Sequence, residues 1–563
     1  PSQPSEGKVW LSVKRGISNK SNYSDENVDV AEQKRELLAE HPWQFGGPST
    51  RLYRRLQSNC IELSKITKWI GIGIMTNADD VFRVSQDQAR RLKLPKNQLR
   101  RLLTGEPTRD WRFVNEDLFA IYPFDDELNL VDIDRLHGMV SYLTPYRTVL
   151  ENRVVFGGNT YKDAGKVWYD YHQITSTMFN DSYSIAFAKI TTHNHATLQP
   201  AQRLINSCTY IVKPGNDSTT SPHFITAILN TSISCFTLKQ LGFNKGAGRD
   251  PVRDRFHYQA AAINKVLVPP IRQSNPQLIK QLTIFAQEQI RLANQIPMLS
   301  LRKIFEMPNE AYQNWIKSLD TYVQRHSDLE RDFGNTSELM VSFNWIRELH
   351  TDTTQRMVFL QEEMDWLAYE MYGLIKKAPL ARDYLTPSQY EKARLQLGQR
   401  AFELVGNGYT GDWPSGYQPD PLPEELKALT EARIALIQSN KDIALLEDPL
   451  YKRRWIPPNY EQEFRDAAHW WLAEKLEYAL EQYGKPISLR RWAREMSRDE
   501  RVMATLEVLT GSPMFDVEKE LHQIIQANAV PNRPEHYLKP SGLRQVGIPG
   551  AEFKSSDFSD GIA

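Results

Sequence analysis

The sequence of 563 residues lacks several features that would place it in a specialised class of protein. It has three cysteines, Cys60, Cys208 and Cys235, which are far apart and form neither CxxC pairs nor an even framework. This spacing excludes a disulfide scaffold and a cysteine-based structural zinc site, and it favours a reduced, cytoplasmic protein. No run of 18 apolar residues occurs, so we expect no membrane-spanning segment.

A net charge is also lacking. Lysine plus arginine and aspartate plus glutamate number 69 each, so the overall charge gives no reason to expect nucleic-acid binding. Any argument for a nucleic-acid partner therefore depends on local basic patches.

Common catalytic and nucleotide-binding motifs are missing as well. The sequence contains no GxSxG, HExxH or GK[ST] motif. The pair Gly71-Ile-Gly73 lacks the third glycine of GxGxxG, because Thr76 stands there, so we interpret the surrounding stretch as strands joined by a turn. His193-Asn-His195 has no further ligands at the spacing of a zinc site, and we interpret it as part of a strand or its exit loop.

The hydrophobic pattern divides the chain into a mixed part and a helical part. Strand-length apolar runs such as DVFRV, RVVFG and VWYDYH are interspersed with helical patches such as FITAILNTSISCFTL, which predicts an α+β domain. Later apolar residues recur at helical spacing, which predicts mainly α-helical C-terminal domains. The predicted segments are a connector (1–64), the α+β domain (65–272), a helical domain (273–400), a Pro/Gly-rich linker (401–423), a C-terminal helical domain (424–538) and a tail (539–563).

Two local basic patches are candidates for DNA contact. Residues 87–112 hold eight Lys or Arg against three acids, and residues 239–258 combine basic side chains with glycines, Asn244 and aromatics. Lys and Arg neutralise phosphates, while Arg, Asn and Gln read base edges, although a solvated surface loop is the alternative. The candidate residues are Arg100, Arg101, Arg109, Arg112, Lys239, Asn244, Lys245, Arg249, Arg253 and Arg255, with Tyr171 and Gln173 as secondary candidates that could equally be half-buried strand residues.

The order of segments between residues 66 and 271 resembles the target recognition domain of large bacterial adenine-N6 DNA methyltransferases. These include the TaqI-like specificity domain, MmeI-type restriction–modification enzymes and PglX-type enzymes of phage defence. IGIGIMTNADDVFRV resembles the opening strand-turn-strand of that domain, and YLTPYRTVLENR resembles its helix ending in L-x-x-R. LFAIYPFDDE, VWYDYH, FITAILNTSISCFTL and AINKVLVPP resemble later segments in the same order, and LQEEMDWLAYEMYGL and PLYKRRW resemble C-terminal regions of the phage-defence enzymes.

The resemblance implies a specificity portion that binds double-stranded DNA and presents an adenine to a catalytic domain. The family's glycine loop for S-adenosylmethionine and its [NDS]PP[YFW] motif are missing here. We therefore expect no cofactor in this chain, S-adenosylmethionine in a methyltransferase catalytic domain or subunit, and contacts between the connector and that partner. Other defence-system proteins are further expected partners. The alternative is a helical scaffold subunit of a defence complex that reads no DNA.

Overall fold

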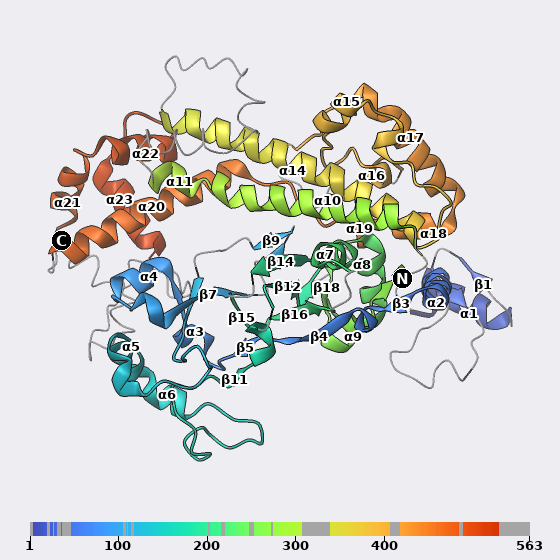
Figure 1. Ribbon diagram of the computed structural model, residues 1–563. Coiled ribbons are helices and arrows are strands. Elements are labelled where there is room, and N and C mark those ends of the chain that lie inside the picture. The colour runs from blue at the N-terminus through green and yellow to red at the C-terminus, as the bar shows by residue number, and fades with distance from the viewer. Residues whose placement is uncertain are drawn as a thin grey trace.

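The structure is a computed structural model, shown as a ribbon in Figure 1. The predicted tail from residue 539 onward lies outside the residues that it describes. The described residues are 4–19, 23–25, 27–30, 35, 47–104, 108–109, 111–113, 118–179, 181–200, 203–215, 220–246, 253–271, 274–306, 338–405, 417–483 and 488–528.

A layer of long helices lies above a layer of sheets and short helices (Figure 1). Helices α10 (Pro276–Gln295) and α14 (Glu338–Met371) pack side by side along the upper layer. This α+β part followed by a mainly helical part confirms the predicted fold class. Among the described residues, no helix is long and apolar enough to cross a membrane. Other helices of the upper layer are α11 (Arg302–Glu306), α15 (Pro387–Lys392), α16 (Ala401–Val405), α17 (Glu424–Ser439), α18 (Lys441–Leu446), α19 (Pro449–Lys452), α20 (Tyr460–Tyr483), α21 (Leu489–Met496), α22 (Glu500–Thr510) and α23 (Val517–Asn528).

The main sheet has four antiparallel strands. Side chains of its central strand β12 alternate between two cores, because successive residues of a strand point to opposite faces. Ile185 and Phe187 belong to the core beneath the helices, whereas Ala186 belongs to a second core on the other face. Helix α7 (Pro222–Leu229) packs against the sheet at β12 and β14. The strand order is β14 (Ala196–Pro200), β12 (Tyr183–Ala188), β16 (Thr209–Pro214) and β4 (Thr67–Ile72).

A second four-stranded sheet and the short helices around it form what we call the β7 lobe, which comprises residues 79–103 and 118–151 together with Leu204–Ile205. It lies at the lower left of Figure 1 and packs around the second core. The sheet order is β15 (Leu204–Ile205), β7 (Leu99–Leu103), β10 (Leu118–Ile121) and β6 (Arg83–Ser85). The helices are α3 (Asp79–Phe82), α4 (Gln86–Arg91), α5 (His137–Leu143) and α6 (Arg147–Glu151).

Neighbouring strands approach the stretch that contains Gly71 and Gly73 closely. Strand β4 pairs with β16, and a Cβ on Gly73 would lie 2.2 Å from the carbonyl oxygen of Ile205. Thr76 holds the following turn, because its hydroxyl oxygen accepts a hydrogen bond from the backbone N–H of Ala78 at 3.1 Å. Gly73 is thus buried against Ile205 of β15, at a point where a side chain would not fit.

Three predicted elements differ in the structure. DVFRV is not one strand, because Asp79–Phe82 forms the single-turn helix α3 and only Arg83–Ser85 continues as β6. RVVFG and VWYDYH belong to a long excursion between α6 and β11 (Gln173–Ile174), in which Val154 and Thr160 form an isolated bridge. Arg153 replaces strand pairing there: its buried guanidinium donates to the carbonyls of Leu150, Trp168, Asp170 and Thr76.

The predicted helix FITAILNTSISCFTL is two helices, α7 and α8 (Ser232–Leu241), rather than one. Asn230 ends α7, and the Thr231 hydroxyl caps α8 by accepting from the N–H of Ser234. The break frees the Asn230 side chain, which bonds to both backbone groups of Ala196 in β14. A polar pair inside an apolar run therefore marks a junction, not a continuous helix.

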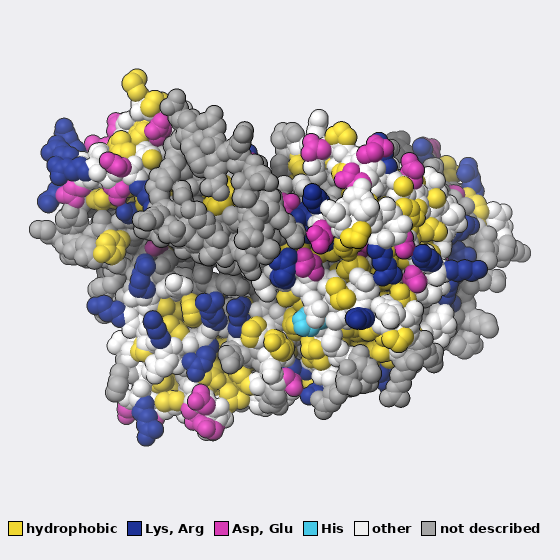
Figure 2. All heavy atoms as spheres, turned by 45° about the horizontal axis from the view of Figure 1, so that its top comes forward, with side chains coloured by type: hydrophobic (Ala, Val, Ile, Leu, Met, Phe, Trp, Pro, Cys, Tyr) yellow, Lys and Arg dark blue, Asp and Glu magenta, His cyan; other side chains and the backbone are white. Residues whose placement is uncertain are grey.

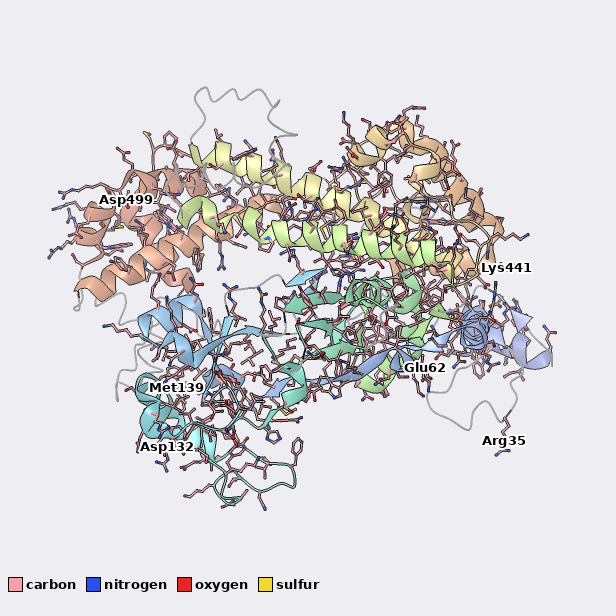
Figure 3. The ribbon with its side chains drawn as sticks, in the orientation of Figure 1. Arg35, Glu62, Asp132, Met139, Lys441 and Asp499 are labelled. Carbon is pink, nitrogen blue, oxygen red and sulfur yellow. The ribbon has the colours of Figure 1, made fainter. Side chains whose placement is uncertain are left out.

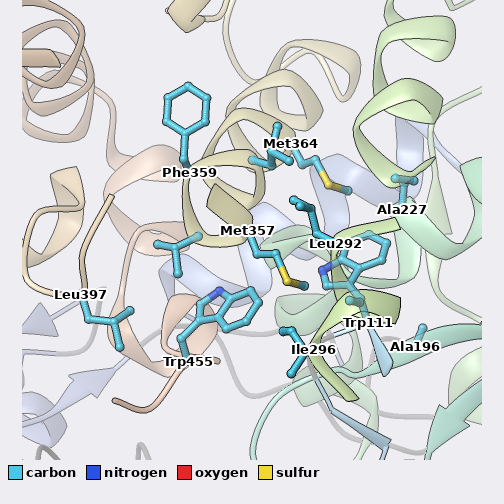
Figure 4. Close-up of a cluster of buried hydrophobic side chains, with 14 of the residues drawn as sticks. Trp111, Ala196, Ala227, Leu292, Ile296, Met357, Phe359, Met364, Leu397 and Trp455 are labelled. Atoms are coloured by element: carbon cyan, nitrogen blue, oxygen red, sulfur yellow. The ribbon is translucent and has the colours of Figure 1, made fainter. Parts of the chain in front are cut away.

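The core beneath the helices is continuous from the mixed part into the helical part. It includes Leu52 of α2 (Pro48–Asn59) in the predicted connector, Phe224 of α7, Leu292 of α10 and Leu521 of α23. Figure 4 shows Trp111 beside the α10 side chain Leu292 and beside Ile296 and Ala196. This core crosses the predicted boundary at residues 272 and 273, and the domain limits themselves stay predictions.

Candidate nucleic-acid interface

The second basic patch folds as a two-stranded ribbon. Strands β17 (Phe243–Gly246) and β18 (Arg255–His257) pair antiparallel, and β18 also pairs with β13 (Ile190–Thr191), which directly follows the central strand β12. Residues 247–252, including Arg249, lie outside the described part of the chain. We call residues 243–246 and 253–257 the β17–β18 ribbon.

Three predicted DNA-contact residues are exposed on the β17–β18 ribbon. Lys245 lies in β17, Arg253 just before β18, and Arg255 at its first position. Asn244 is partly committed within the ribbon: its side chain donates to Asp254 Oδ2 at 2.7 Å and accepts from the N–H of Gly246 at 2.6 Å. The ribbon thus places several cations at an exposed edge, while the Asn244 side chain is bonded within the ribbon, to Asp254 and to the N–H of Gly246.

Lys239 differs from its prediction as a DNA-contact residue. It lies on α8, is 8 % exposed, and its Nζ donates to the carbonyl of Leu450 at 2.7 Å. The same ammonium lies 4.9 Å from the centre of the Phe256 ring of β18. Burial lowers the pKa of Lys239. Because this residue is on the inner face of α8, we assign it to the attachment of the ribbon to the helical layer and not to a DNA-facing surface.

The secondary candidates Tyr171 and Gln173 lie at the second core. Tyr171 is 2 % exposed, donates to the carbonyl of Ile121 at 2.6 Å, and packs edge-on against Phe82 and Phe124. It is therefore a core residue, which corrects its prediction. Gln173 is half-buried in β11, where it pairs with Met75.

The first basic patch is divided by the structure. Arg100 and exposed Arg101 lie in β7 of the β7 lobe, where the Arg100 guanidinium is 4.8 Å from the centre of the Tyr122 ring. Arg109 and Arg112 lie in a separate hairpin, formed by β8 (Thr108–Arg109) and β9 (Arg112–Phe113), which packs against β12, β14 and α10. The four arginines therefore do not form one surface.

The β7 lobe carries an exposed group of basic residues. Figure 2 shows Lys and Arg side chains gathered over it at the lower left. Arg90 of α4 is 64 % exposed, and its guanidinium lies 3.4 Å from Glu474 of α20. Lys93 and Arg101 are exposed nearby in the sequence. Arg90 thus connects this basic face of the lobe to the C-terminal helices.

A buried polar junction, which the sequence did not reveal, joins the two layers at the break between α7 and α8. Arg454 donates to the carbonyl of Asn230 at 2.8 Å, to its side-chain oxygen at 3.0 Å, and to Nδ1 of His195 at 3.3 Å. The Gln361 amide of α14 donates to the same Asn230 carbonyl at 3.0 Å. Because buried polar groups must be paired, this arrangement fixes how the helices sit on the main sheet.

The two histidines of His193-Asn-His195 serve this same junction. His193 Nε2 lies 3.2 Å from the carbonyl oxygen of Pro449, to which it donates. Burial and the neighbouring cations, Lys239 for His193 and Arg454 for His195, lower the pKa of both imidazoles well below the usual value. Among the described residues, no group of three or more His, Cys, Asp or Glu side chains could hold a metal ion.

A second buried polar cluster lies within the helical layer. Lys452 is surrounded by three carboxylates, with Nζ 2.9 Å from Glu362, 3.0 Å from Asp365 and 3.1 Å from Glu447. Tyr369 donates to Glu447 at 2.7 Å. We call Lys452 and the three carboxylates the Lys452 cluster. One ammonium compensates one of three charges, and burial raises the pKa of Glu447 to about 7.

Comparison with known proteins gives a relative of similar sequence. The chain is 26 % identical over 570 residues to "Adenine-specific methyltransferase PglX" of Streptomyces coelicolor. It is homologous to this PglX. The match covers 97 % of this chain and 44 % of the relative, so the chain spans less than half of the relative's length. This confirms the PglX part of the resemblance in the sequence.

Two further comparisons concern parts of the chain. Residues 357–547 match a family described as a domain of unknown function (DUF7008). The structure also has a weak likeness to the type IIL restriction–modification enzyme MmeI in complex with DNA, with a TM-score of 0.32 and 11 % identity over 53 % of this chain and 37 % of that one.

Proposed function

We propose that this chain is the DNA-specificity portion of an S-adenosylmethionine-dependent adenine-N6 DNA methyltransferase of restriction–modification or phage defence. The observation that carries the proposal is the similarity to an adenine-specific methyltransferase along 97 % of the chain. Catalysis belongs to a domain or subunit corresponding to the part of such an enzyme outside the match. This chain binds the duplex and presents the target adenine, which leaves the base stack to reach the catalytic pocket.

The β17–β18 ribbon supports this role by its shape and charge. The major groove of B-DNA admits a two-stranded ribbon, and Lys245, Arg253 and Arg255 would neutralise phosphates or read base edges from it. The position of the ribbon is fixed, because β18 pairs with β13 and its Phe256 ring contacts the buried ammonium of Lys239. A fixed position keeps the basic side chains aligned with the bases.

The proposal is tested by measuring binding of the chain to fluorescein-labelled duplex DNA by fluorescence anisotropy at several salt concentrations. The ribbon variant, Lys245→Ala with Arg253→Ala and Arg255→Ala, removes three exposed cations. We expect weaker binding, and a salt dependence whose slope falls by about one for each phosphate that the variant no longer neutralises. A base-reading arginine would in addition cost about 1–3 kcal/mol of discrimination between sites.

A matched control removes three exposed lysines of the helical layer that lie outside the β17–β18 ribbon. The distal-lysine variant is Lys376→Ala with Lys392→Ala and Lys441→Ala; Figure 3 shows Lys441 at the right end of the molecule. It changes net charge by the same amount and should bind as the unmodified chain does. Equal losses in both variants, or no duplex binding together with salt-insensitive binding to a protein partner, would contradict the proposal and favour a scaffold subunit.

A further inference from the structure

Helix α21 presents a row of arginines on the side opposite its buried face. Trp492 of this helix is 3 % exposed and belongs to the core, whereas Arg490 and Arg494 are exposed, and exposed Arg498 follows in the next turn. Arg490 and Arg494 are four positions apart, so they share one face of α21 at about 6 Å along it, and Arg498 lies just past the end of the helix, in the turn before α22. We call Arg490, Arg494 and Arg498 the arginine stripe.

Two acids close to the stripe in sequence form ion pairs with other cations. Glu495 lies 3.4 Å from Arg491, and Asp499 lies 3.0 Å from Lys475 of α20. Within the described residues, the guanidinium groups of the stripe form no ion pair. In a chain whose formal net charge is zero, these three exposed cations form a local concentration of positive charge.

The stripe belongs to the helices that meet the basic face of the β7 lobe. Helix α21 packs on α23, which packs on α20, and Glu474 of α20 is the partner of Arg90. Figure 2 shows Lys and Arg side chains at the upper left edge of the molecule as well as over the lobe below it. The stripe is therefore linked to the basic face of the lobe through α23 and α20.

The chemistry of the stripe favours a phosphate backbone over a lipid surface. Guanidinium groups match phosphate oxygens in bidentate geometry, and a regular row of them suits a regular row of phosphates. A membrane-surface helix would expose its apolar face, but Trp492 and Ala493 are buried in the protein.

We propose that the arginine stripe binds the backbone of double-stranded DNA outside the site read by the β17–β18 ribbon. The stripe lies within the part of the chain that matches the domain of unknown function, and it gives that part a role as a sequence-independent clamp on flanking duplex. This inference rests on the proposed function, because the duplex is the one that the specificity portion recognises.

The test uses the full chain with Arg490→Ala, Arg494→Ala and Arg498→Ala together, compared with the distal-lysine variant. Anisotropy is measured on labelled duplexes of increasing length, in two series of unrelated sequence. We expect the stripe variant to bind long duplexes on the order of tenfold more weakly, with a salt slope lower by up to about three. The loss should be the same for both sequences and should vanish on duplexes too short to reach α21.

The outcomes separate this inference from the proposed function. If the ribbon variant loses binding while the stripe variant matches the distal-lysine variant, the clamp is wrong and the specificity role stands. If only the stripe variant loses binding, the clamp is supported and the role of the ribbon is wrong. Absence of any duplex binding by the unmodified chain overturns both, whereas a stripe variant that binds DNA normally but no longer binds phosphatidylserine vesicles overturns the clamp alone.

Discussion

Replacing Lys452 by methionine should destabilise the protein strongly. Its Nζ lies within 3.1 Å of three carboxylates, and the side chain has no exposed surface. Methionine keeps most of the volume but removes the only ammonium of the Lys452 cluster, which leaves Glu362, Asp365 and Glu447 buried together. Removing one partner of a buried ion pair costs about 3–5 kcal/mol, a large part of the roughly 5–15 kcal/mol that stabilises a typical domain.

The assay is urea unfolding followed by tryptophan fluorescence, since five of the 13 tryptophans, Trp111, Trp366, Trp455, Trp471 and Trp492, lie in the core beneath the helices. The control is Lys427→Met, which breaks an exposed ion pair with Glu424 and should unfold at nearly the same urea concentration as the unmodified chain.

The penalty should also depend on pH and on the remaining carboxylates. Protonation relieves the repulsion, so Lys452→Met should be less harmful at acidic than at alkaline pH. Adding Glu447→Gln should restore part of the loss, because it removes one of the uncompensated charges. A Lys452→Met protein that unfolds at the same urea concentration as the control variant would refute this reasoning.

Three further changes test other parts of the structure. The pKa of Glu447 is raised from 4.5 to about 7, so its favourable contribution to folding stability is complete below about pH 4.5 and is lost as the pH rises through 7. Between these limits, the unfolding free energy of Glu447→Gln should therefore gain up to about 3 kcal/mol relative to that of the unmodified chain. Gly73→Ala should cost about 1–3 kcal/mol, seen as a lower melting temperature, because its Cβ would press on the carbonyl of Ile205; an unchanged melting temperature would contradict the packing described. Arg153→Met should make residues 154–168 sensitive to limited proteolysis, whereas Arg147→Met, whose side chain is 59 % exposed, should not.

The sequence predicted the division into mixed and helical parts because periodicity is set by which side chains are buried. It also placed the second basic patch on an exposed segment. It could not show that the Lys239 side chain is buried, since the burial of Lys239 depends on its contact with Leu450 of α19, which is more than 200 residues away in the sequence. The break at Asn230 was likewise hidden, because it depends on β14 and Arg454. The arginines of the stripe were present in the sequence, but their shared exposure depends on the packing of Trp492 into the core, which the sequence alone did not show.

The polar junction at Asn230 has a consequence for dividing this chain into parts. Because Arg454 and Gln361 bond to the break between α7 and α8 from the helical side, cutting the chain near residue 272 would leave buried polar groups without these partners and would expose the shared core. A fragment that ends there would therefore present apolar surface that the full chain buries.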